Sequence, residues 1–401
     1  MFGMKGRGRF LLAAMASPLA IAAPQLTLTA THGLDIARPS EMIAVPWQDV
    51  ARALPGAMMQ KLVVKDAAGQ VLPYQVVNFD YDAKGIKPGF AELLFQHDFA
   101  AGQHAATFTI ERSETIVAPF PAKTFARLVP ERLDDFAWEN DRIAHRTYGP
   151  ALAAPDSARS GKEVLVASGI DVWSKRVRYP VIDRWYNKGS YHRDDGEGFD
   201  MYKTGNSRGT GGTGIWDGKQ LHISGNFVSW KILANGPIRT VFELAYAPWE
   251  ANGVKVAEVK RFTVDAGHNL DTIDSTFTYD GGQPLTVGLG ITKNSAEKDQ
   301  FGSVEVQRAE SGKTLLQWEA QKSNGELGEA VVLPQGAAGF AEDGANQLIL
   351  ARVQSGQPLH YLAGAGWSKS GDFPNKQAWF AYVADAAARA AAPLTIKLSV
   401  N

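Results

Sequence analysis

The stretches that decide the fold read RTVFELAY at residues 239–246, VKVAEVKRFTVD at 254–265 and LDTIDSTFTY at 270–279. Each stretch is rich in β-branched or aromatic residues, and Gly, Asn or Asp lies between one and the next. This is the pattern of strands that are joined by turns. Strands that follow one another through such short connections pair antiparallel. Residues 239–279 therefore predict consecutive antiparallel strands.

Segments of the same kind lie on both sides, at residues 220–233, 285–291, 347–353, 359–367, 377–384 and 394–400. In the last of them, apolar residues alternate with Thr395, Lys397 and Ser399, so one face of that strand is expected to be buried. Helix-like periodicity is confined to residues 46–54 and 385–391. No short internal repeat points to a propeller or a solenoid. We predict an all-β protein that is built from antiparallel sheets.

The chain divides near residue 120. Strand-like segments at residues 61–64 and 106–110 belong to the first part, and VAPFPAKT at 117–124 resembles a linker with two prolines. We expect a small N-terminal β-sandwich over residues 23–120 and a large antiparallel supersandwich over 121–401 that carries the active cleft. An antiparallel unit of that size usually needs two large stacked sheets.

The first residues have the order of a signal peptide. Lys5, Arg7 and Arg9 precede an apolar run over residues 10–22, which ends with Ala20 and Ala22 in an A-x-A arrangement. That run is shorter than the roughly 20 residues that span a bilayer. The sequence has no cysteine, which rules out a lipid anchor and disulfides. We expect residues 1–22 to be removed and the mature chain to be periplasmic or secreted, without a membrane anchor.

Composition narrows the classes of partner. The formal net charge is -1, so there is no basic field that would attract nucleic acid. The 40 glycines suit many turns, and the 10 tryptophans and 11 tyrosines suit either a flat ligand such as a sugar or an aromatic core. We expect a saccharide as the partner, whereas the oligomeric state stays open.

Polar and aromatic residues concentrate at residues 171–216, which read DVWSKRVRYPVIDRWYNKGSYHRDDGEGFDMYKTGNSRGTGGTGIW. Long structured loops on a β scaffold are where binding and catalysis usually occur. A solvated surface loop with scattered ion pairs is the alternative. This mixture of residue types favours a functional site. Tyr191 and His192 lie beside carboxylates and near cations in the sequence, and such groups adjust the pKa of a proton-transfer residue. The titratable residues of this segment include Lys175, Arg176, Arg178, Arg184, Tyr186, Tyr191, His192, Asp194, Asp195, Glu197 and Asp200.

A second polar cluster precedes this region at residues 138–142, followed by His145, Arg146 and Tyr148. It either lines the same site or belongs to an ordinary strand. The other histidines stand alone on predicted strands or turns, and we expect them to be structural: His97, His104, His222, His268 and His360.

The glycine-rich segment GNSRGTGGTG at residues 205–214 lacks the G-K-[ST] ending of a phosphate-binding loop and the context of a dinucleotide motif. We interpret it as a flexible rim of a cleft. Zinc is disfavoured, because cysteines and paired histidines at helical spacing are absent. His192 with Asp194, Asp195, Glu197 and Asp200 could hold a calcium-like cation, although no cofactor is required.

Three longer motifs stand out: AWENDRIAHRTYGPAL at residues 137–152, DVWSKRVRYPVIDRWY at 171–186 and YHRDDGEGFDMYKTGNSRGTGGTGIW at 191–216. Together with NGPIR at 235–239 and KRF at 260–262, they resemble a family of exported bacterial proteins that is catalogued as domain of unknown function 4861. The resemblance covers nearly the whole mature chain. It implies a galactose-mutarotase-like supersandwich and, by association, a role in the breakdown of pectin and related uronic-acid polysaccharides. It brings no catalytic residues with it.

The leading hypothesis is an exported, lyase-like enzyme that acts on uronic-acid-containing poly- or oligosaccharides by β-elimination. Arg178 or Arg184 would bind the uronate carboxylate. His192 would be the base, and Tyr191 the acid or an alternative base. We expect these groups around one cleft. The residues expected to contact substrate are Lys175, Arg178, Arg184, Tyr186, Asp194, Glu197, Asp200 and Arg208, together with Trp138, Glu139 and Asp141.

Two other functions stay open at this point. A glycoside hydrolase or sugar epimerase would need two carboxyl groups that flank a cleft, drawn from Glu139, Asp141, Asp194, Asp195, Glu197 and Asp200. A non-catalytic periplasmic carbohydrate-binding protein would use the aromatic rings to stack on sugars and the arginines to hold a carboxylate. The sugar, the linkage and the endo or exo mode are equally open.

Overall fold

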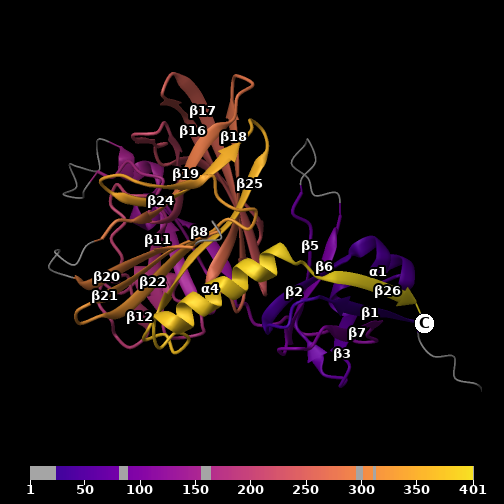
Figure 1. The fold of residues 1–401 in the computed structure, drawn as a ribbon. Coiled ribbons are helices and arrows are strands. Elements are labelled where there is room, and N and C mark those ends of the chain that lie inside the picture. Colours follow the sequence, from indigo (N-terminus) through magenta and orange to yellow (C-terminus); the bar gives the residue numbers. More distant parts are fainter. Residues whose placement is uncertain (1–23, 81–88, 155–163, 295–300, 310–312, 401) are drawn as a thin grey trace, which may run out of the picture.

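The computed structural model describes residues 24–80, 89–154, 164–294, 301–309 and 313–400 (Figure 1). The predicted signal peptide, residues 1–22, lies outside these ranges. No helix in the described ranges is long and apolar enough to cross a membrane.

The N-terminal part is a sandwich of two small antiparallel sheets. One sheet has the order β26-β1-β7-β3-β4 and the other β2-β6-β5. Alternating apolar residues of both sheets form one core around Leu28, Ile43, Phe95 and Phe108. The elements are β1 (Gln25–Thr31), β2 (Arg38–Pro46), α1 (Trp47–Ala53), η1 (Met59–Lys61), β3 (Leu62–Asp66), β4 (Val71–Leu72), β5 (Tyr74–Val77), β6 (Glu92–Phe99), β7 (Ala105–Arg112) and β26 (Thr395–Val400).

The last strand, β26, belongs to the first sheet. It pairs antiparallel with β1, with Leu26 opposite Val400 and Thr31 opposite Thr395, and Figure 1 shows the yellow end of the chain inside the indigo part. The alternation predicted at residues 394–400 is present, because Ile396 and Leu398 pack on the N-terminal core. Strand β26 is therefore part of the N-terminal sandwich, although the large unit was expected to span residues 121–401.

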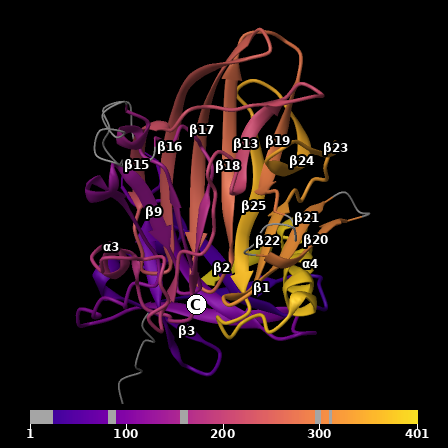
Figure 2. The same ribbon diagram turned by 90° about the vertical axis from the view of Figure 1, so that its left-hand side faces the viewer.

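The large part stacks an eight-stranded sheet, β15-β16-β17-β18-β25-β22-β21-β20, on a five-stranded sheet, β14-β13-β19-β24-β23. Figure 2 shows β16, β17, β18 and β25 side by side. The elements are β13 (Thr210–Trp216), β14 (Leu221–His222), β15 (Phe227–Ala234), β16 (Arg239–Ala251), β17 (Val254–Asp265), β18 (Leu270–Tyr279), β19 (Leu285–Thr292), β20 (Phe301–Arg308), β21 (Thr314–Gln321), β22 (Gly325–Val332), β23 (Gly339–Glu342), β24 (Asn346–Val353) and β25 (Pro358–Trp367).

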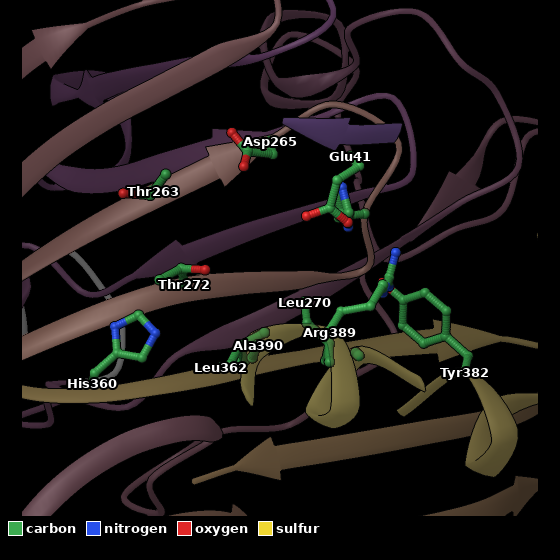
Figure 3. Close-up of a pocket in the computed structure, with 12 residues that line it drawn as sticks. Glu41, Thr263, Asp265, Leu270, Thr272, His360, Leu362, Tyr382, Arg389 and Ala390 are labelled. Atoms are coloured by element: carbon green, nitrogen blue, oxygen red, sulfur yellow. The ribbon is translucent and has the colours of Figure 1, made fainter. Parts of the chain in front are cut away.

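Helix α4 (Lys376–Ala391) covers the outer face of the large sheet. Its buried residues include Trp379 and Val383, which pack on Trp318 of β21, and the Asn375 side chain accepts a hydrogen bond from the Ala378 N–H (3.0 Å) as an N-cap. The prediction of a strand at residues 377–384 is wrong, because the buried positions recur with helical spacing. Near its C-terminus, α4 meets β17, β18 and β2 around a small cavity (Figure 3).

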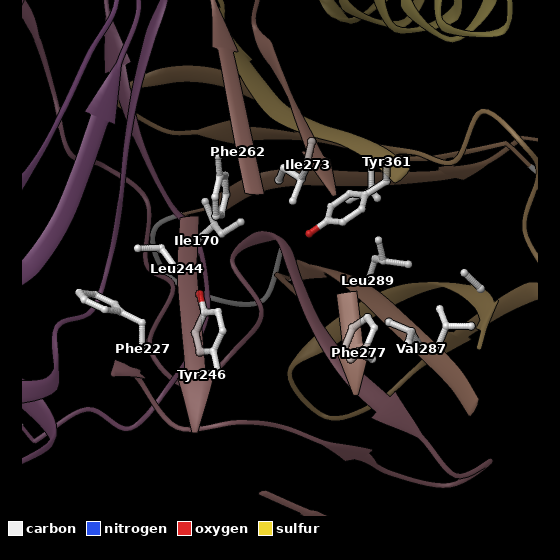
Figure 4. Packing of buried hydrophobic residues seen from close by; sticks show 14 of the residues in the cluster. Ile170, Phe227, Leu244, Tyr246, Phe262, Ile273, Phe277, Val287, Leu289 and Tyr361 are labelled. Carbon is white, nitrogen blue, oxygen red and sulfur yellow. The ribbon is translucent and has the colours of Figure 1, made fainter. Parts of the chain in front are cut away.

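The main core lies between the two stacked sheets. Phe262 and Ile273 of the eight-stranded sheet face Leu289 of the five-stranded sheet within one buried cluster (Figure 4). In β17 and β18 they are directly paired, as consecutive antiparallel strands require. The structure confirms the predicted all-β fold of antiparallel sheets.

The large part has a third antiparallel sheet, β12-β11-β10-β9-β8, which packs one face against this core through Phe136 and Trp138. Its other face is covered by helix α3 and by the loop that follows to residue 200. Its elements are β8 (Phe125–Val129), β9 (Asp135–Glu139), β10 (Ile143–Thr147), β11 (Asp171–Lys175), α3 (Ile182–Tyr186) and β12 (Gly198–Phe199), with the short helices η2 (Pro130–Arg132) and η3 (Pro150–Ala153).

Candidate functional site

The covered face of the third sheet carries a layer of charged residues. Side chains alternate along strands, and Arg146 lies opposite Asp171 and Ala137, so charges on three adjacent strands share this face. All of them are buried, which is costly unless the charges are paired. We call this set the polar layer: Asp135, Glu139, Arg146, Asp171 and Lys175.

One end of the polar layer is structural. Lys175 Nζ donates to Glu139 Oε2 (2.6 Å) and to the Asn140 carbonyl (2.7 Å). Glu139 also accepts the backbone N–H groups of Val181 and Ile182 at the start of α3, each at 2.9 Å. Burial lowers the pKa of the Lys175 ammonium, against the effect of Glu139. Both side chains are 1% exposed, so they anchor α3 rather than meet a ligand.

The other end of the polar layer surrounds Arg146. Its Nε donates to Asp171 Oδ2 (2.7 Å) and its Nη2 to Asp200 Oδ2 (3.0 Å), while Asp135 Oδ2 lies 3.7 Å from Nη1. Burial raises the pKa of Asp135 to about 6 and that of Asp200 well above its usual range. Burial opposes the charge on Arg146, but the carboxylates outweigh it and raise the Arg146 pKa.

Gly198 of β12 makes this packing possible. Its φ of +109° is one that L side chains rarely adopt, and a Cβ there would lie 2.0 Å from the Ser174 carbonyl oxygen of β11. Only glycine allows β12 to come this close, and β12 leads directly to Asp200.

Tyr191 and His192 meet beside Arg146. The Tyr191 phenolic oxygen accepts hydrogen bonds from Arg132 Nε (3.1 Å) and Arg146 Nη1 (3.0 Å). The His192 ring centroid lies 4.5 Å from that of Tyr191, and His192 Nδ1 lies 3.1 Å from the Asp200 carbonyl oxygen. The His192 side chain is 60% exposed. The pair therefore connects the buried charges to the surface.

Several buried polar atoms around this pair have no hydrogen-bond partner within the described residues. Unsatisfied buried groups cost about 1–3 kcal/mol each, and in native structures they are commonly met by water, a proton or a ligand. This end of the layer therefore retains unused capacity for hydrogen bonding. The atoms are Arg132 Nη1, Asp135 Oδ2, Tyr186 Oη and Asp200 Oδ1.

The two arginines that were expected to bind substrate lie elsewhere. Arg178 Nη2 pairs with Asp372 Oδ1 (2.8 Å), and Arg184 Nη2 pairs with Glu197 Oε1 (2.7 Å). In the described part of the chain, neither contacts Tyr191 or His192. Both guanidinium groups are instead paired with other carboxylates, Asp372 and Glu197. Arg132 and Arg146 occupy that position instead.

Of the other residues that were expected to contact substrate, one lies beside Tyr191 and His192, and the rest are held by other partners. Tyr186 belongs to the site: it packs on Trp173 and Tyr191, and burial raises its pKa well above the usual range. Asp194 pairs with Arg176, and Glu197 also accepts from Tyr179 and Trp185.

Three predicted residues have structural partners away from the pair. Trp138 lies on the opposite face of its strand and donates to Asp271 Oδ2 (2.7 Å). Asp141 accepts from the Gly267 N–H (2.7 Å). Arg208 is fully buried and donates to Ser168 Oγ (2.9 Å), and burial lowers its pKa to about 10.

Sequence reasoning missed Arg132, Asp135 and Asp171 as site residues. Charges that share one face of a strand ordinarily indicate a face in water, so the sequence offers no reason to expect the buried position of Asp135. The signal that identifies them is that three neighbouring strands carry opposite charges in matching positions.

No group of three or more His, Cys, Asp or Glu side chains in the described ranges is arranged to hold a metal ion. The carboxylates that were grouped around His192 each face an arginine: Asp194 with Arg176, Asp195 with Arg193, Glu197 with Arg184, and Asp200 with Arg146. A guanidinium thus takes the position that a calcium-like cation would need.

Stacked antiparallel sheets with a charged layer beneath a polar loop define an all-β sandwich protein with a candidate acid–base site. The family model described as "Domain of unknown function (DUF4861)" matches residues 31–396, and the chain belongs to this family. It is 32% identical over 387 residues to "Uncharacterized protein P7" of Formosa agariphila, covering 92% of this chain and 93% of that protein. These matches confirm the resemblance that the motifs indicate.

Two solved structures from Enterococcus faecalis are similar at low identity. An alpha-mannosidase matches at 10% identity and a TM-score of 0.41, over 94% of this chain and 46% of that chain. A protein in the glycosyl hydrolase family 38 matches at 11% identity and a TM-score of 0.41, over 95% and 48%. The chain spans about half the length of these structures.

Proposed function

We propose that this protein is an exported enzyme that cleaves uronic-acid-containing poly- or oligosaccharides by β-elimination. The observation that carries the proposal is the placement of Tyr191, whose phenolic oxygen accepts from two arginines while its ring lies against exposed His192. An oxygen acid and a nitrogen base thus lie side by side next to positive charge.

The reaction sets three requirements. A base removes the proton from the carbon next to the uronate carboxylate, and the electron pair forms a carbon–carbon double bond. The bond to the leaving sugar oxygen breaks, and an acid supplies a proton to that oxygen. A cation must bind the carboxylate, because negative charge develops on it as the proton leaves.

The chain has a group for each requirement. Arg132 Nη1 has no hydrogen-bond partner in the described part of the chain, and Arg132 is the cation for the uronate carboxylate, in place of Arg178 or Arg184. His192 Nδ1 is held by Asp200. When Nδ1 carries the proton, Nε2 is left as an acceptor and can act as the base. Tyr191 O–H is the acid for the leaving oxygen.

Hydrolysis or epimerisation by paired carboxylates has less support. Glu139 is held by Lys175 and two backbone N–H groups, and Asp194 and Glu197 each face an arginine. These contacts occupy the oxygens that a carboxylate mechanism needs. A carbohydrate-binding protein is the remaining alternative.

The test is an assay of the purified protein on fragments of pectin, alginate and glucuronan. Ultraviolet absorbance of the unsaturated uronate product should rise, and Tyr191→Phe and His192→Ala should each lose about 10²–10⁴-fold in turnover. Arg193→Gln is the matched control, because its side chain is 76% exposed and pairs with Asp195. New reducing ends without absorbance would indicate hydrolysis instead. Full turnover in both site variants would refute the assignment.

A further inference from the structure

A cavity of about 170 Å³ lies where the N-terminal sandwich, the large sheet and α4 meet (Figure 3). Its polar lining includes residues from elements far apart in the sequence: Glu41 of β2, Thr263 and Asp265 of β17, Thr272 of β18, and Arg389 of α4. No member of the polar layer lines it. A single water needs about 10–15 Å³ by this kind of measure, so the cavity has room for a small molecule.

Arg389 is a cation without a carboxylate partner in the described ranges. Its side chain is buried, with the residue 7% exposed. Nη1 donates to the Pro39 carbonyl (3.2 Å), and Nε is buried and has no hydrogen-bond partner among the residues that the structure describes. A buried guanidinium is costly unless its charge and its donors are met. The cavity thus contains an unmet positive charge and an unmet donor.

The two carboxylates in the wall are already neutralised. Glu41 accepts both Nε (3.0 Å) and Nη2 (2.9 Å) of Arg38, and Asp265 accepts both Nε (2.6 Å) and Nη2 (2.7 Å) of Arg239. Bidentate pairs of this kind are strong and directional. Because Glu41 and Asp265 are neutralised in this way, Arg389 is the uncompensated charge that an incoming ligand would contact.

His268 in the wall is held in a setting that disfavours its charged form. Burial lowers its pKa, and its Nε2 lies 3.0 Å from the Ser40 carbonyl oxygen. At the rim, His360 Nδ1 pairs with Asp274 Oδ1 (2.9 Å).

The rest of the lining suits a hydroxylated molecule. Thr263 and Thr272 are directly opposite each other on adjacent strands, so their hydroxyl groups share one wall. Leu270 and Leu362 supply an apolar surface near them. One cation, two neighbouring hydroxyl groups and an apolar patch are complementary to a small carboxylate that carries hydroxyl groups and C–H faces.

We propose that this cavity binds a single sugar acid, with its carboxylate on the Arg389 guanidinium group and its hydroxyl groups on Thr263 and Thr272. The choice of a sugar acid rests on the proposed function, because such molecules are products of uronide breakdown. The ligand would connect α4, the large sheet and β2, which belong to different parts of the fold.

The experiment is isothermal titration calorimetry of the full mature chain with D-glucuronate, D-glucose and inorganic phosphate. Glucuronate should bind once per chain, and glucose about tenfold more weakly or worse, because it lacks the charged hydrogen bond. Arg389→Gln should weaken glucuronate about tenfold or more. Thr272→Val should also weaken it, and this variant keeps the Arg389 contact with Pro39 if Arg389→Gln does not fold.

Each contrary result has a defined meaning. Equal binding of glucuronate by Arg389→Gln and by the natural chain would overturn the proposal, as would equal binding of glucose. Phosphate that binds as tightly through Arg389 would overturn the sugar-acid assignment. Tyr191→Phe should bind glucuronate normally even where elimination is lost, so failure of the proposed reaction and failure of this site are distinguishable.

Discussion

Arg146 holds three buried carboxylates together, and its removal would leave them facing one another. We expect Arg146→Met to lower the free energy of unfolding by about 3–5 kcal/mol, the usual cost of breaking a buried ion pair from one side. Urea unfolding followed by tryptophan fluorescence measures this. Arg193→Gln removes an exposed arginine from a surface pair and should leave the midpoint unchanged. An unchanged midpoint for Arg146→Met would show that the polar layer does not depend on this pairing.

The ionisation of Asp271 makes the free energy of unfolding depend on pH. Burial raises its pKa from 3.8 to about 7, so between these values the folded chain keeps a proton that the unfolded chain has released. Its ionisation therefore lowers stability as pH rises from about 4 to 7. Asp271→Asn resembles the protonated form and can still accept from Trp138.

The stability of Asp271→Asn relative to the natural chain should accordingly increase over that range, by up to about 1.4 kcal/mol per pH unit, and level off above pH 7. Urea unfolding at several pH values measures the difference. Neighbouring His145, whose pKa burial lowers to about 4, titrates with the opposite sign but is present in both proteins. Asp280→Asn, at an exposed position, should show no such trend. A flat difference for Asp271→Asn would contradict the raised pKa.

At the level of elements, β26 should stabilise the N-terminal sandwich through its buried side. Leu398 packs on that core, whereas neighbouring Lys397 is exposed. We expect Leu398→Ser to cost about 1–2 kcal/mol of unfolding free energy, from lost apolar burial, and Lys397→Ser to cost far less. Thermal unfolding of both variants measures this. Equal effects would mean that pairing with β1, rather than side-chain burial, holds the strand.

The elements that the sequence predicts best are those with one exposed face. The antiparallel strands at residues 239–279 and the alternation at residues 394–400 follow directly from the pattern of side chains. Helix α4 was missed in its first half, because WFAYV at residues 379–383 has the composition of a strand, and only the packing of Trp379 and Val383 reveals its period. The burial of charged residues on β9, β10 and β11 is hard to predict for a different reason, since these charges face another buried layer and not water.

The sequence reveals the site residues that are adjacent in the chain, but not those that only strand pairing brings together. Tyr191 and His192 are adjacent in sequence and remain adjacent in space, so their grouping is predictable. Arg132 and Asp135 precede them by more than fifty residues, and only the pairing of β9, β10 and β11 brings them together. Arg178 and Arg184 are near in sequence, but their side chains lie on the outer side of the covering segment.

For the whole molecule, the decisive prediction concerns export. Residues 1–22 have the order of charge, apolar run and small residues that signal peptidase recognises. We expect the protein that is recovered from the periplasm or medium of an expressing bacterium to lack them, with a new N-terminus at Ala23. N-terminal sequencing checks this, and Ala20→Tyr with Ala22→Tyr should block the cleavage. Recovery of an uncleaved chain from the cytoplasm alone would contradict the proposal.

The pairing of β26 with β1 has a consequence for the order of events during synthesis. Strand β1 lacks one neighbour until residues 395–400 have been made, and an uncovered strand edge is a site for wrong pairing. A chain that passes through a secretion channel from its N-terminus would therefore emerge with its first sheet incomplete. That sheet can close only after residues 395–400 are available to pair with β1.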